Sequence, residues 1–449
     1  MYPKEIPLFK ELMPYSGQID LENRWIKMAE ILPWDELDGI YQRYFDDRKL
    51  SVVKKCRLIM GLMVGQMILE MSDRQIVEYF HENPYFQYFC GQDTFVTKLN
   101  GRVIHPSLLS KRRRRLGIEY MKAFESEVLK ILVTRGVVKG KKLMLDATVF
   151  EANITYPNDV KLLNTVREWG CHTILKIKNI LDPKQKIRTM KRSARKVYLQ
   201  YQKTRRKTDA YIRKTRNRML RFTKRNIGQL ELLIARAKSN TESFVVSNLS
   251  KIEERLSVAK LIYEQQLTMA KTRGKRVANR IVSFHQPLVR PMIRGKEGGN
   301  YEFGIKAHVA LVDGYAFLDR AQPDPFHEGN LLPDSVTQHT QRFGKPPQIV
   351  IADQLYATRS NRTFLKDHNI HHAFKSIGRP PNISEKTARL ERASRKNHQV
   401  SRNAIEGLFG HLKSRFNLNR TTWTVPNGPD FQVRLGLMAF NLHRALANS

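Results

Sequence analysis

The sequence has few cysteines, few acidic residues for its length and no long apolar run. Three cysteines among 449 residues lie far apart, which excludes a disulfide framework and a paired-cysteine metal site. The most apolar run covers residues 58–71, shorter than the roughly 20 residues of a membrane span, and predicts a buried helix. We expect no secretory signal at the N-terminus. These absences favour a protein of the reducing cytoplasm with no membrane partner.

What the chain has in excess is positive charge. Its 79 Lys and Arg residues outnumber 42 Asp and Glu, so the formal net charge is +37. Hydrophobic residues make up 41% of the chain, enough for a packed core, which excludes wholesale disorder. Such an excess of cations indicates a polyanionic partner: nucleic acid first, and an anionic membrane surface as the weaker alternative.

Residues 1–135 have the three- and four-residue apolar spacing of helices, with Ser72 and Asp73 placed to cap one of them. Five consecutive cations follow further along, at Lys111, Arg112, Arg113, Arg114 and Arg115. Such a run is often only a solvated helix face, but in so basic a chain we expect it to contact phosphate. We therefore predict a helical N-terminal domain, 1–135, for DNA binding or dimerisation.

Strand patterns begin after residue 141. The run KLMLDATVF (142–150) predicts a buried strand with an acid at its centre, and QIVIAD (348–353) predicts a second that ends in an acid. Two further runs, 301–312 and 315–319, flank Asp313-Gly314, a strong hairpin signal. IHHAF (370–374) resembles a short strand, and the chain looks helical from after residue 382 to about 418. This alternation predicts a mixed α/β sheet flanked by helices.

Between these strand patterns, residues 184–286 contain no proline and only two glycines, which predicts long helices. Spacings of three and four residues along 190–215 and 249–263 predict an antiparallel helical hairpin that turns at 239–241. Residues 176–225 alone carry 20 Lys or Arg and two acids, a net +18. A solvated coiled coil usually mixes both signs, so this bias favours an arm that lies along phosphates.

The best candidates for catalytic acids are Asp146, Asp353 and Glu406. Asp146 and Asp353 each lie in or at the end of an apolar strand, where an unpaired carboxylate is costly and ligand sites form. Each has an ordinary alternative: a strand-end acid often caps the next helix, and Glu406 can pair with Arg402 at i−4. Together, three carboxylates on two strands and a helix suit hard divalent cations and two-metal phosphoryl chemistry.

These residues carry a family resemblance. The strand Asp146, the strand Asp353 followed by Tyr356, and the helix with Arg402, Glu406 and Lys413 resemble the DDE transposases of bacterial insertion sequences. The helix is similar to the family's Y-x2-R-x3-E-x6-K signature, with Gln399 at the tyrosine position as a departure. The resemblance also covers His105-Pro-Ser and the cations after it, the YPND-x-x-LL segment at 156–163, and Phe303-Gly-Ile-Lys306. The long helical stretch is the part that it covers least.

The resemblance implies a ribonuclease-H-like catalytic domain, 136–449, with the basic helical hairpin, 165–283, inserted in it. Asp146, Asp353 and Glu406 would hold two Mg²⁺ or Mn²⁺ ions, and Arg402 and Lys413 would hold phosphate beside them. The implied partner is double-stranded DNA, as the terminal inverted repeats of the element and as the target.

We also expect a homodimer, because two element ends must be joined, and association with the nucleoid in the cytoplasm. No Walker-type loop is present, so no nucleotide cofactor is expected. Two alternatives stay open: a ribonuclease-H-like nuclease that cuts without joining, and a catalytically inactive DNA-binding protein.

Overall fold

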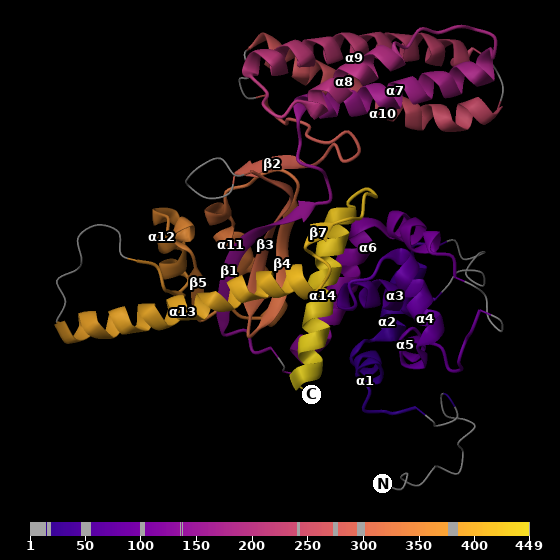
Figure 1. Ribbon diagram of the computed structural model, residues 1–449. Helices are drawn as coiled ribbons and strands as arrows, with labels where there is room; N and C mark the ends of the chain where they lie inside the picture. The colour runs from indigo at the N-terminus through magenta and orange to yellow at the C-terminus, as the bar shows by residue number, and fades with distance from the viewer. Residues whose placement is uncertain are drawn as a thin grey trace. The chain divides into compact units, whose positions relative to one another are not determined.

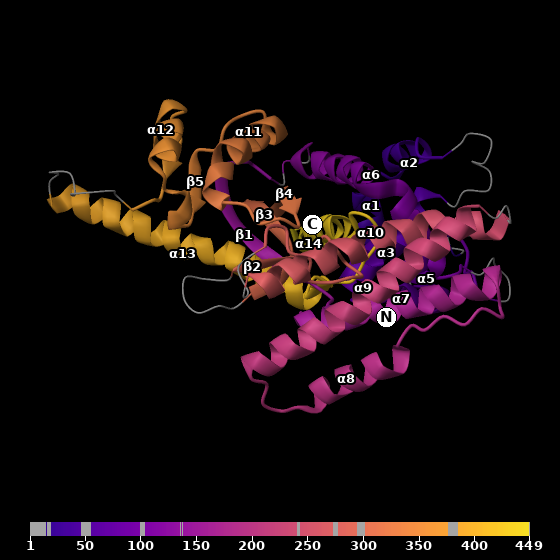
Figure 2. The same ribbon diagram turned by 90° about the horizontal axis from the view of Figure 1, so that it is seen from above.

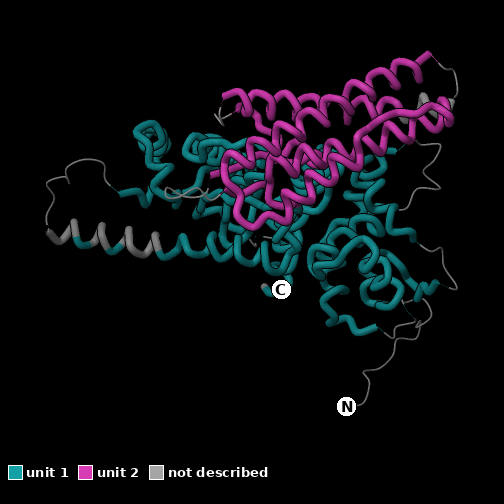
Figure 3. Tube along the Cα trace, turned by 45° about the horizontal axis from the view of Figure 1, so that its top comes forward, with its two compact units in different colours: residues 1–153, 304–449 teal, residues 154–303 magenta. Residues whose placement is uncertain are grey.

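The structure is a computed structural model that describes residues 15, 19–45, 55–98, 104–134, 136, 138–239, 243–272, 277–293, 301–375 and 385–448. The chain divides into two compact units (Figure 3). Unit 1 contains residues 1–153 and 304–449, and unit 2 contains residues 154–303. The polypeptide therefore leaves unit 1 at residue 154, forms unit 2, and returns to unit 1 at residue 304.

The N-terminal part of unit 1 is helical, as the apolar spacing predicts. Its helices are α1 (Arg24–Ile31), α2 (Trp34–Gln42), α3 (Cys56–Ile68), α4 (Asp73–Glu82), α5 (Pro84–Phe89) and α6 (Ser107–Thr134). The expected cap is present: the Ser72 side chain accepts a hydrogen bond from the Gln75 backbone, and the Gln75 side chain closes the capping box. Nearly every residue of α3 is buried, which explains its unusually apolar sequence.

A mixed sheet is built around the strand β1 (Lys142–Ala152), and all of it belongs to unit 1 except β2 and the first three residues of β3. In the described residues the sheet has seven strands in the order β2-β3-β1-β5-β6, with β4 paired to β3 and β7 paired to β1. Strand β1 runs antiparallel to β3 and parallel to β5. The remaining strands are β2 (Arg290–Ile293), β3 (Tyr301–Val312), β4 (Tyr315–Gln322), β5 (Ile349–Ala352), β6 (His371–His372) and β7 (Arg420–Thr421).

The hairpin between β3 and β4 turns at Asp313-Gly314, as expected. Both residues have positive φ, 51° and 88°, the backbone of a tight two-residue hairpin turn. The Asp313 carboxylate also accepts hydrogen bonds from the backbone N–H groups of Lys139 and Gly140. This turn therefore ties the hairpin to the segment that leads into β1.

Helices follow the later strands (Figures 1 and 2). They are α11 (Leu332–Phe343), α12 (Arg359–Asp367), α13 (Glu385–Arg415) and α14 (Gly428–Asn448), with short 3₁₀ turns η4 (Glu328–Leu331) and η5 (Gln354–Tyr356). Helix α13 packs against β1 and β5. The sequence patterns above made no prediction for α14, yet this helix packs against β4, α3 and α6.

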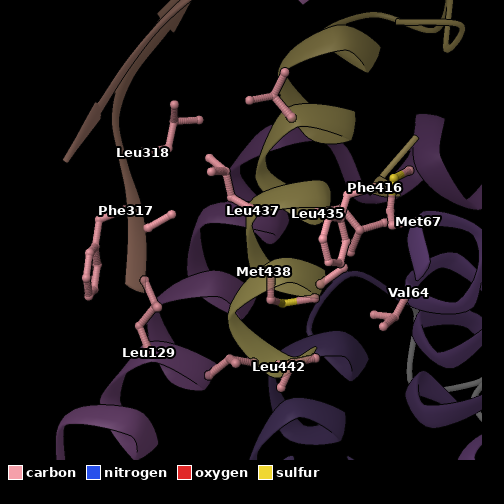
Figure 4. Packing of buried hydrophobic residues seen from close by; sticks show 14 of the residues in the cluster. Val64, Met67, Leu129, Phe317, Leu318, Phe416, Leu435, Leu437, Met438 and Leu442 are labelled. Carbon is pink, nitrogen blue, oxygen red and sulfur yellow. The ribbon is translucent and has the colours of Figure 1, made fainter. Parts of the chain in front are cut away.

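The core of unit 1 gathers around α14 (Figure 4). Leu435, Leu437, Met438 and Leu442 of α14 are buried and meet side chains from the sheet and from the N-terminal helices. Because one buried cluster includes both groups of elements, the N-terminal helices and the sheet share a single hydrophobic core.

Unit 2 is a helical bundle, and here the expected two-helix arm needs correction. Its helices are α7 (Asp159–Leu181), α8 (Lys191–Lys203), α9 (Asp209–Lys238) and α10 (Ser243–Lys271). Helices α9 and α10 do run antiparallel, since Lys238 pairs with Glu253 and Glu231 with Lys260. The expected turn at 239–241 falls partly outside the described residues.

The first half of the expected arm is interrupted rather than continuous. Helix α8 ends at Thr204, and α9 starts anew after Thr208, whose side chain accepts a hydrogen bond from the Tyr211 backbone. Threonine favours such capping over a helix interior. Most of helix α7 lies within the expected hairpin at 165–283, and α7 packs along α9, so the region is more than a two-helix arm.

Across the described ranges, no helix combines the length and apolarity required to cross a bilayer.

Candidate active site

The register of two neighbouring strands positions the first pair of acids. Strands β1 and β5 are parallel, and Leu145 is paired with Ala352 at the last position of their ladder. Asp146 and Asp353 each follow that pair by one residue. The two carboxylates therefore start from adjacent strands at the same level of the sheet.

Asp353 also begins the next turn. Its side chain accepts a hydrogen bond from the Leu355 backbone N–H and so caps η5. This is the ordinary role of a strand-end acid, and it leaves the second carboxylate oxygen without a role in the cap. The cap fixes the Asp353 carboxylate at the C-terminal end of β5, next to the strand that carries Asp146.

A buried polar network holds the chain that follows Asp353. The Tyr356 hydroxyl lies 2.9 Å from His308 Nε2, and Ser335 Oγ lies 3.4 Å from His308 Nδ1. The carboxylate of Asp319 lies 3.9 Å from His308 Nδ1 and accepts a hydrogen bond from Arg342 at 2.7 Å. Burial lowers the pKa of His308 to about 4, so its ring is neutral at pH 7. These contacts indicate a structural role for His308.

The third acid comes from α13. Ile405, Leu408, Phe409 and Leu412 form the buried face of this helix. Glu406 borders that face and remains 53% exposed, and Arg402, one turn earlier, donates to it at 2.7 Å. The i−4 pair considered from the sequence is therefore present.

Lys413 faces the sheet from the same helix. Its Nζ lies 3.1 Å from the Thr148 hydroxyl on β1 and 5.9 Å from the centre of the Phe150 ring. Thr148 is two residues beyond Asp146 on the same strand. Lys413 therefore places a positive charge beside the strand that carries the first acid. Gln399 belongs to α13 as well, but its side chain lies outside what the structure describes.

Electrostatics connects these groups. Burial raises the pKa of Asp146 to about 6. The backbone N–H of Ala147 and the guanidinium of Arg402 lower this pKa, whereas the carboxylates of Glu328 and Asp353 raise it further. The pKa of Arg402 is raised, first by its hydrogen bond to Glu406 and then, against desolvation, by the charges of Asp146, Glu406 and Asp353. The Arg402 guanidinium is hydrogen-bonded to Glu406, and the charges of Asp146 and Asp353 also favour its protonated form.

A fourth carboxylate, Glu328, was not singled out from the sequence. It starts η4, which packs against η5, and Lys306 Nζ lies 2.7 Å from its Oε1. Lys306 belongs to the Phe303-Gly-Ile-Lys306 segment that contributes to the family resemblance. Lys306 lies on a strand beside β1, and its position could have pointed to Glu328, because a half-buried lysine needs an acidic partner.

The donor set suits a hard divalent cation, although the site is not preformed. Within the described parts of the chain, no three His, Cys, Asp or Glu side chains lie close enough together to hold a metal ion. Asp146, Asp353 and Glu406 nevertheless supply only carboxylate oxygens, the ligands that Mg²⁺ and Mn²⁺ prefer. The raised pKa of Asp146 adds to this fit, because a carboxylate destabilised by burial and other acids gains most from a nearby cation.

The basic run on α6 divides between the surface and the interior. Arg113 is 4% exposed: its guanidinium pairs with Asp73 at 2.5 Å and lies 4.1 Å from the centre of the Trp423 ring. This arginine therefore joins α4 and α6 to the segment before α14. Its charge is already paired inside the unit, so we no longer assign it a DNA contact.

Of the other four cations of the run, Lys111, Arg114 and Arg115 are exposed and Arg112 is half-buried. Arg112 and Arg115 lie over the Phe45 ring at 4.6 and 5.1 Å. Stacking on an aromatic ring leaves the edge of a guanidinium able to bind an anion. These four residues keep the expected role as candidate phosphate contacts.

Comparison with known proteins adds independent findings. The family model "Transposase DDE domain" matches residues 350–424, which include Asp353, Arg402, Glu406 and Lys413. The model "Transposase domain (DUF772)" matches residues 14–115, which include most of the N-terminal helices and the basic run. A curated relative, "Uncharacterized protein ORF8 in nfe locus" of Rhizobium meliloti, is 26% identical over 141 residues. That match covers 30% of this chain and 66% of the relative, just under two thirds. No solved structure matches the chain.

Proposed function

We propose, from the premise that this chain belongs to the DDE transposases of insertion sequences, that it cuts DNA at element ends and joins them to target DNA. The family acts on DNA, and the two family models cover the N-terminal helices and the segment from β5 to β7. The specific reaction is water-driven cleavage of a phosphodiester, followed by attack of the freed 3′ hydroxyl on target DNA.

One observation carries this proposal: the fold brings the chain segments that bear Asp146, Asp353 and Glu406 into contact. The first two acids lie on adjacent parallel strands, and the third lies on a helix that packs against both strands. Local capping or helix pairing alone does not explain why three segments so far apart in sequence, each bearing one of these acids, pack together. This arrangement supports a ribonuclease-H-like catalytic domain.

We assign roles to the residues as follows. Asp146, Asp353 and Glu406 would hold divalent ions, which, when bound, activate the attacking oxygen and stabilise the leaving oxygen. Lys413, fixed beside Thr148, would bind the phosphate next to the one that is cut. The buried network behind Asp353 would keep its carboxylate oriented during both steps.

DNA contacts outside the site would come from two basic surfaces. Lys111, Arg112, Arg114 and Arg115 of α6 suit the recognition of element ends by the N-terminal helices. The exposed cations of α9 suit the phosphate backbone along flanking DNA. We propose that two copies of the chain act together, one at each end of the element.

The decisive experiment is an end-cleavage and joining assay. A plasmid carrying the DNA that flanks the gene on both sides is incubated with the purified full chain, a target plasmid and Mg²⁺ or Mn²⁺. The variants Asp146→Asn and Glu406→Gln are compared with Arg415→Gln, an exposed arginine in the last turn of α13. We expect loss of both cleavage and joining by at least a hundredfold in the first two, and full activity in the third.

The alternatives give different products. Nicked ends without joined products would identify a nuclease and refute strand transfer. Salt-sensitive DNA binding with no cleavage in any protein would identify an inactive DNA-binding protein. Joining that survives Asp146→Asn or Glu406→Gln would refute the assigned metal ligands.

A further inference from the structure

A single aromatic side chain, Phe45, contacts two cations of the basic run on α6. Phe45 comes shortly after α2, and its backbone N–H donates to the Gln42 carbonyl at 2.9 Å. Its ring centre lies 4.9 Å from the ring centre of Tyr41, a side chain that is only 1% exposed. Because Tyr41 belongs to the buried core of unit 1, the half-buried Phe45 ring is a platform with a fixed position.

Arg112 and Arg115 both lie over this ring, with 4.6 and 5.1 Å between the guanidinium carbon and the ring centre. Arg115 Nε also donates to the Tyr44 backbone carbonyl at 3.1 Å. Arg113, which separates the two in sequence, pairs with Asp73 and so fixes the helix turn from which both side chains project. Arginine side chains usually sample many rotamers, and these two have lost much of that freedom before any ligand is bound.

The two guanidinium groups lack an acidic partner. In the part of the chain that the structure describes, no carboxylate forms an ion pair with Arg112 or Arg115. Two cations at i and i+3 beside one ring repel each other, and the aromatic ring attracts each of them only weakly. An anion bound to both would relieve this repulsion. The contacts therefore form a preorganised site for an anion rather than a completed ion pair.

We infer that Phe45 is the positioning residue of a two-arginine clamp, in which Arg112 and Arg115 together bind one phosphate of a DNA duplex. The inference rests on the proposed function, from which it takes DNA as the partner. A phosphate has enough oxygens to accept from both guanidinium groups, and a contact of this kind fixes the register of a protein on DNA. Lys111 and Arg114 are exposed and contribute attraction that is not tied to one phosphate.

The competing explanation is that the two arginines only cover the Phe45 ring. Long cationic side chains often lie along apolar surface while their charge stays in water, and such packing stabilises the fold without a ligand. In that case loss of the ring would lower the stability of unit 1 and leave the affinity for DNA unchanged. The two explanations therefore differ in how DNA affinity depends on Phe45.

The test measures the affinity of the full chain for a labelled duplex taken from the DNA that flanks the gene, with a chelator present to prevent cleavage. We expect Phe45→Leu to bind the duplex about tenfold more weakly than wild type, because two arginines must then be ordered on binding. The salt dependence of binding should stay the same, since no charge is removed. Phe45→Tyr keeps the ring and should restore wild-type affinity.

A double-mutant cycle separates the clamp from general attraction. Phe45→Leu should cause no further loss when Arg112→Gln and Arg115→Gln are already present. It should cause its full tenfold loss when Lys111→Gln and Arg114→Gln are present, a pair that removes the same charge from the same helix. Wild-type DNA affinity in folded Phe45→Leu, or an equal loss in both backgrounds, would overturn the inference.

The charge-matched pairs also decide the question if Phe45→Leu does not fold. The clamp requires the protein with Arg112→Gln and Arg115→Gln to bind DNA more weakly than the protein with Lys111→Gln and Arg114→Gln, and equal affinities would refute it. Failure of the proposed function is distinguishable: the tenfold loss would then be found although the wild type neither cleaves nor joins DNA.

Discussion

The Asp146 carboxylate should destabilise the metal-free protein. Burial, with Glu328 and Asp353 nearby, raises its pKa from 3.8 to about 6. Each pKa unit corresponds to about 1.4 kcal/mol, so keeping this group ionised at pH 8 costs the folded state about 3 kcal/mol relative to the unfolded chain. Asparagine has nearly the same shape and no charge. Asp146→Asn should therefore stabilise the metal-free fold while it abolishes the reaction.

The pH dependence follows from the sign of the shift. An acid whose folded pKa is raised destabilises the fold above its unfolded pKa, and the cost reaches its full value above the folded pKa. The gain from Asp146→Asn should therefore fall from about 3 kcal/mol at pH 8 to about 1.6 kcal/mol at pH 5, and vanish below about pH 3.8.

The assay is urea unfolding in the presence of a chelator, followed by tryptophan fluorescence. Three of the four tryptophans, Trp25, Trp34 and Trp423, lie in unit 1, so the signal reports mainly on the unit that contains Asp146. The matched control is Asp367→Asn, at an exposed position in the last turn of α12, with an expected change below about 0.5 kcal/mol.

Adding Mn²⁺ provides the complementary result. The ion should stabilise the wild type and not Asp146→Asn, so the two stabilities should converge or reverse as the ion is added. If Asp146→Asn is no more stable than wild type at pH 8 without metal, the electrostatic account of the site is refuted.

Three further predictions concern the framework and the basic surface. Arg434→Met leaves the buried Glu125 without the partner that lies 2.5 Å away and should cost about 3–5 kcal/mol by urea unfolding, a loss that Glu125→Leu should largely restore. Gly304→Ala should prevent stable folding at 37 °C, because the added Cβ would lie 2.0 Å from the Phe150 carbonyl oxygen; a melting temperature equal to wild type would contradict the pairing of β1 with β3. Glutamine at four exposed cations of α9 should reduce the salt dependence of duplex binding by up to about four units in the log–log slope, and an unchanged slope would remove α9 from the DNA surface; the four are Arg213, Lys214, Arg218 and Arg221.

Local patterns were sufficient for much of the fold. The apolar run around Asp146 is strand β1, the Asp313-Gly314 signal is the turn of the β3–β4 hairpin, and Ser72 caps α4. Each of these depends on residues close together in sequence, through side-chain alternation, positive φ or a capping hydrogen bond. The two family models agree with the resemblance noted from the acids and their spacing.

Patterns of the same kind did not distinguish buried cations from surface ones. Arg113 looks like its neighbours in a run of five, yet it pairs with Asp73 beneath the surface. The expected arm at 184–239 breaks after Thr204, because Thr208 caps a new helix. In both cases the deciding contact involves a partner or a local conformation that periodicity does not reveal.

The sequence by itself determined which residues are chemically able to act: three acids in specific contexts, an arginine and a lysine spaced around the last of them, and a large excess of cations. Only the tertiary structure decided that the segments bearing these acids pack together, and that Lys306 pairs with Glu328. Asp146 and Glu406 are 260 positions apart, and the elements that carry them meet because α13 packs on β1 and β5. Long-range packing of this kind depends on how whole faces of helices and sheets fit together, which no short window of sequence contains.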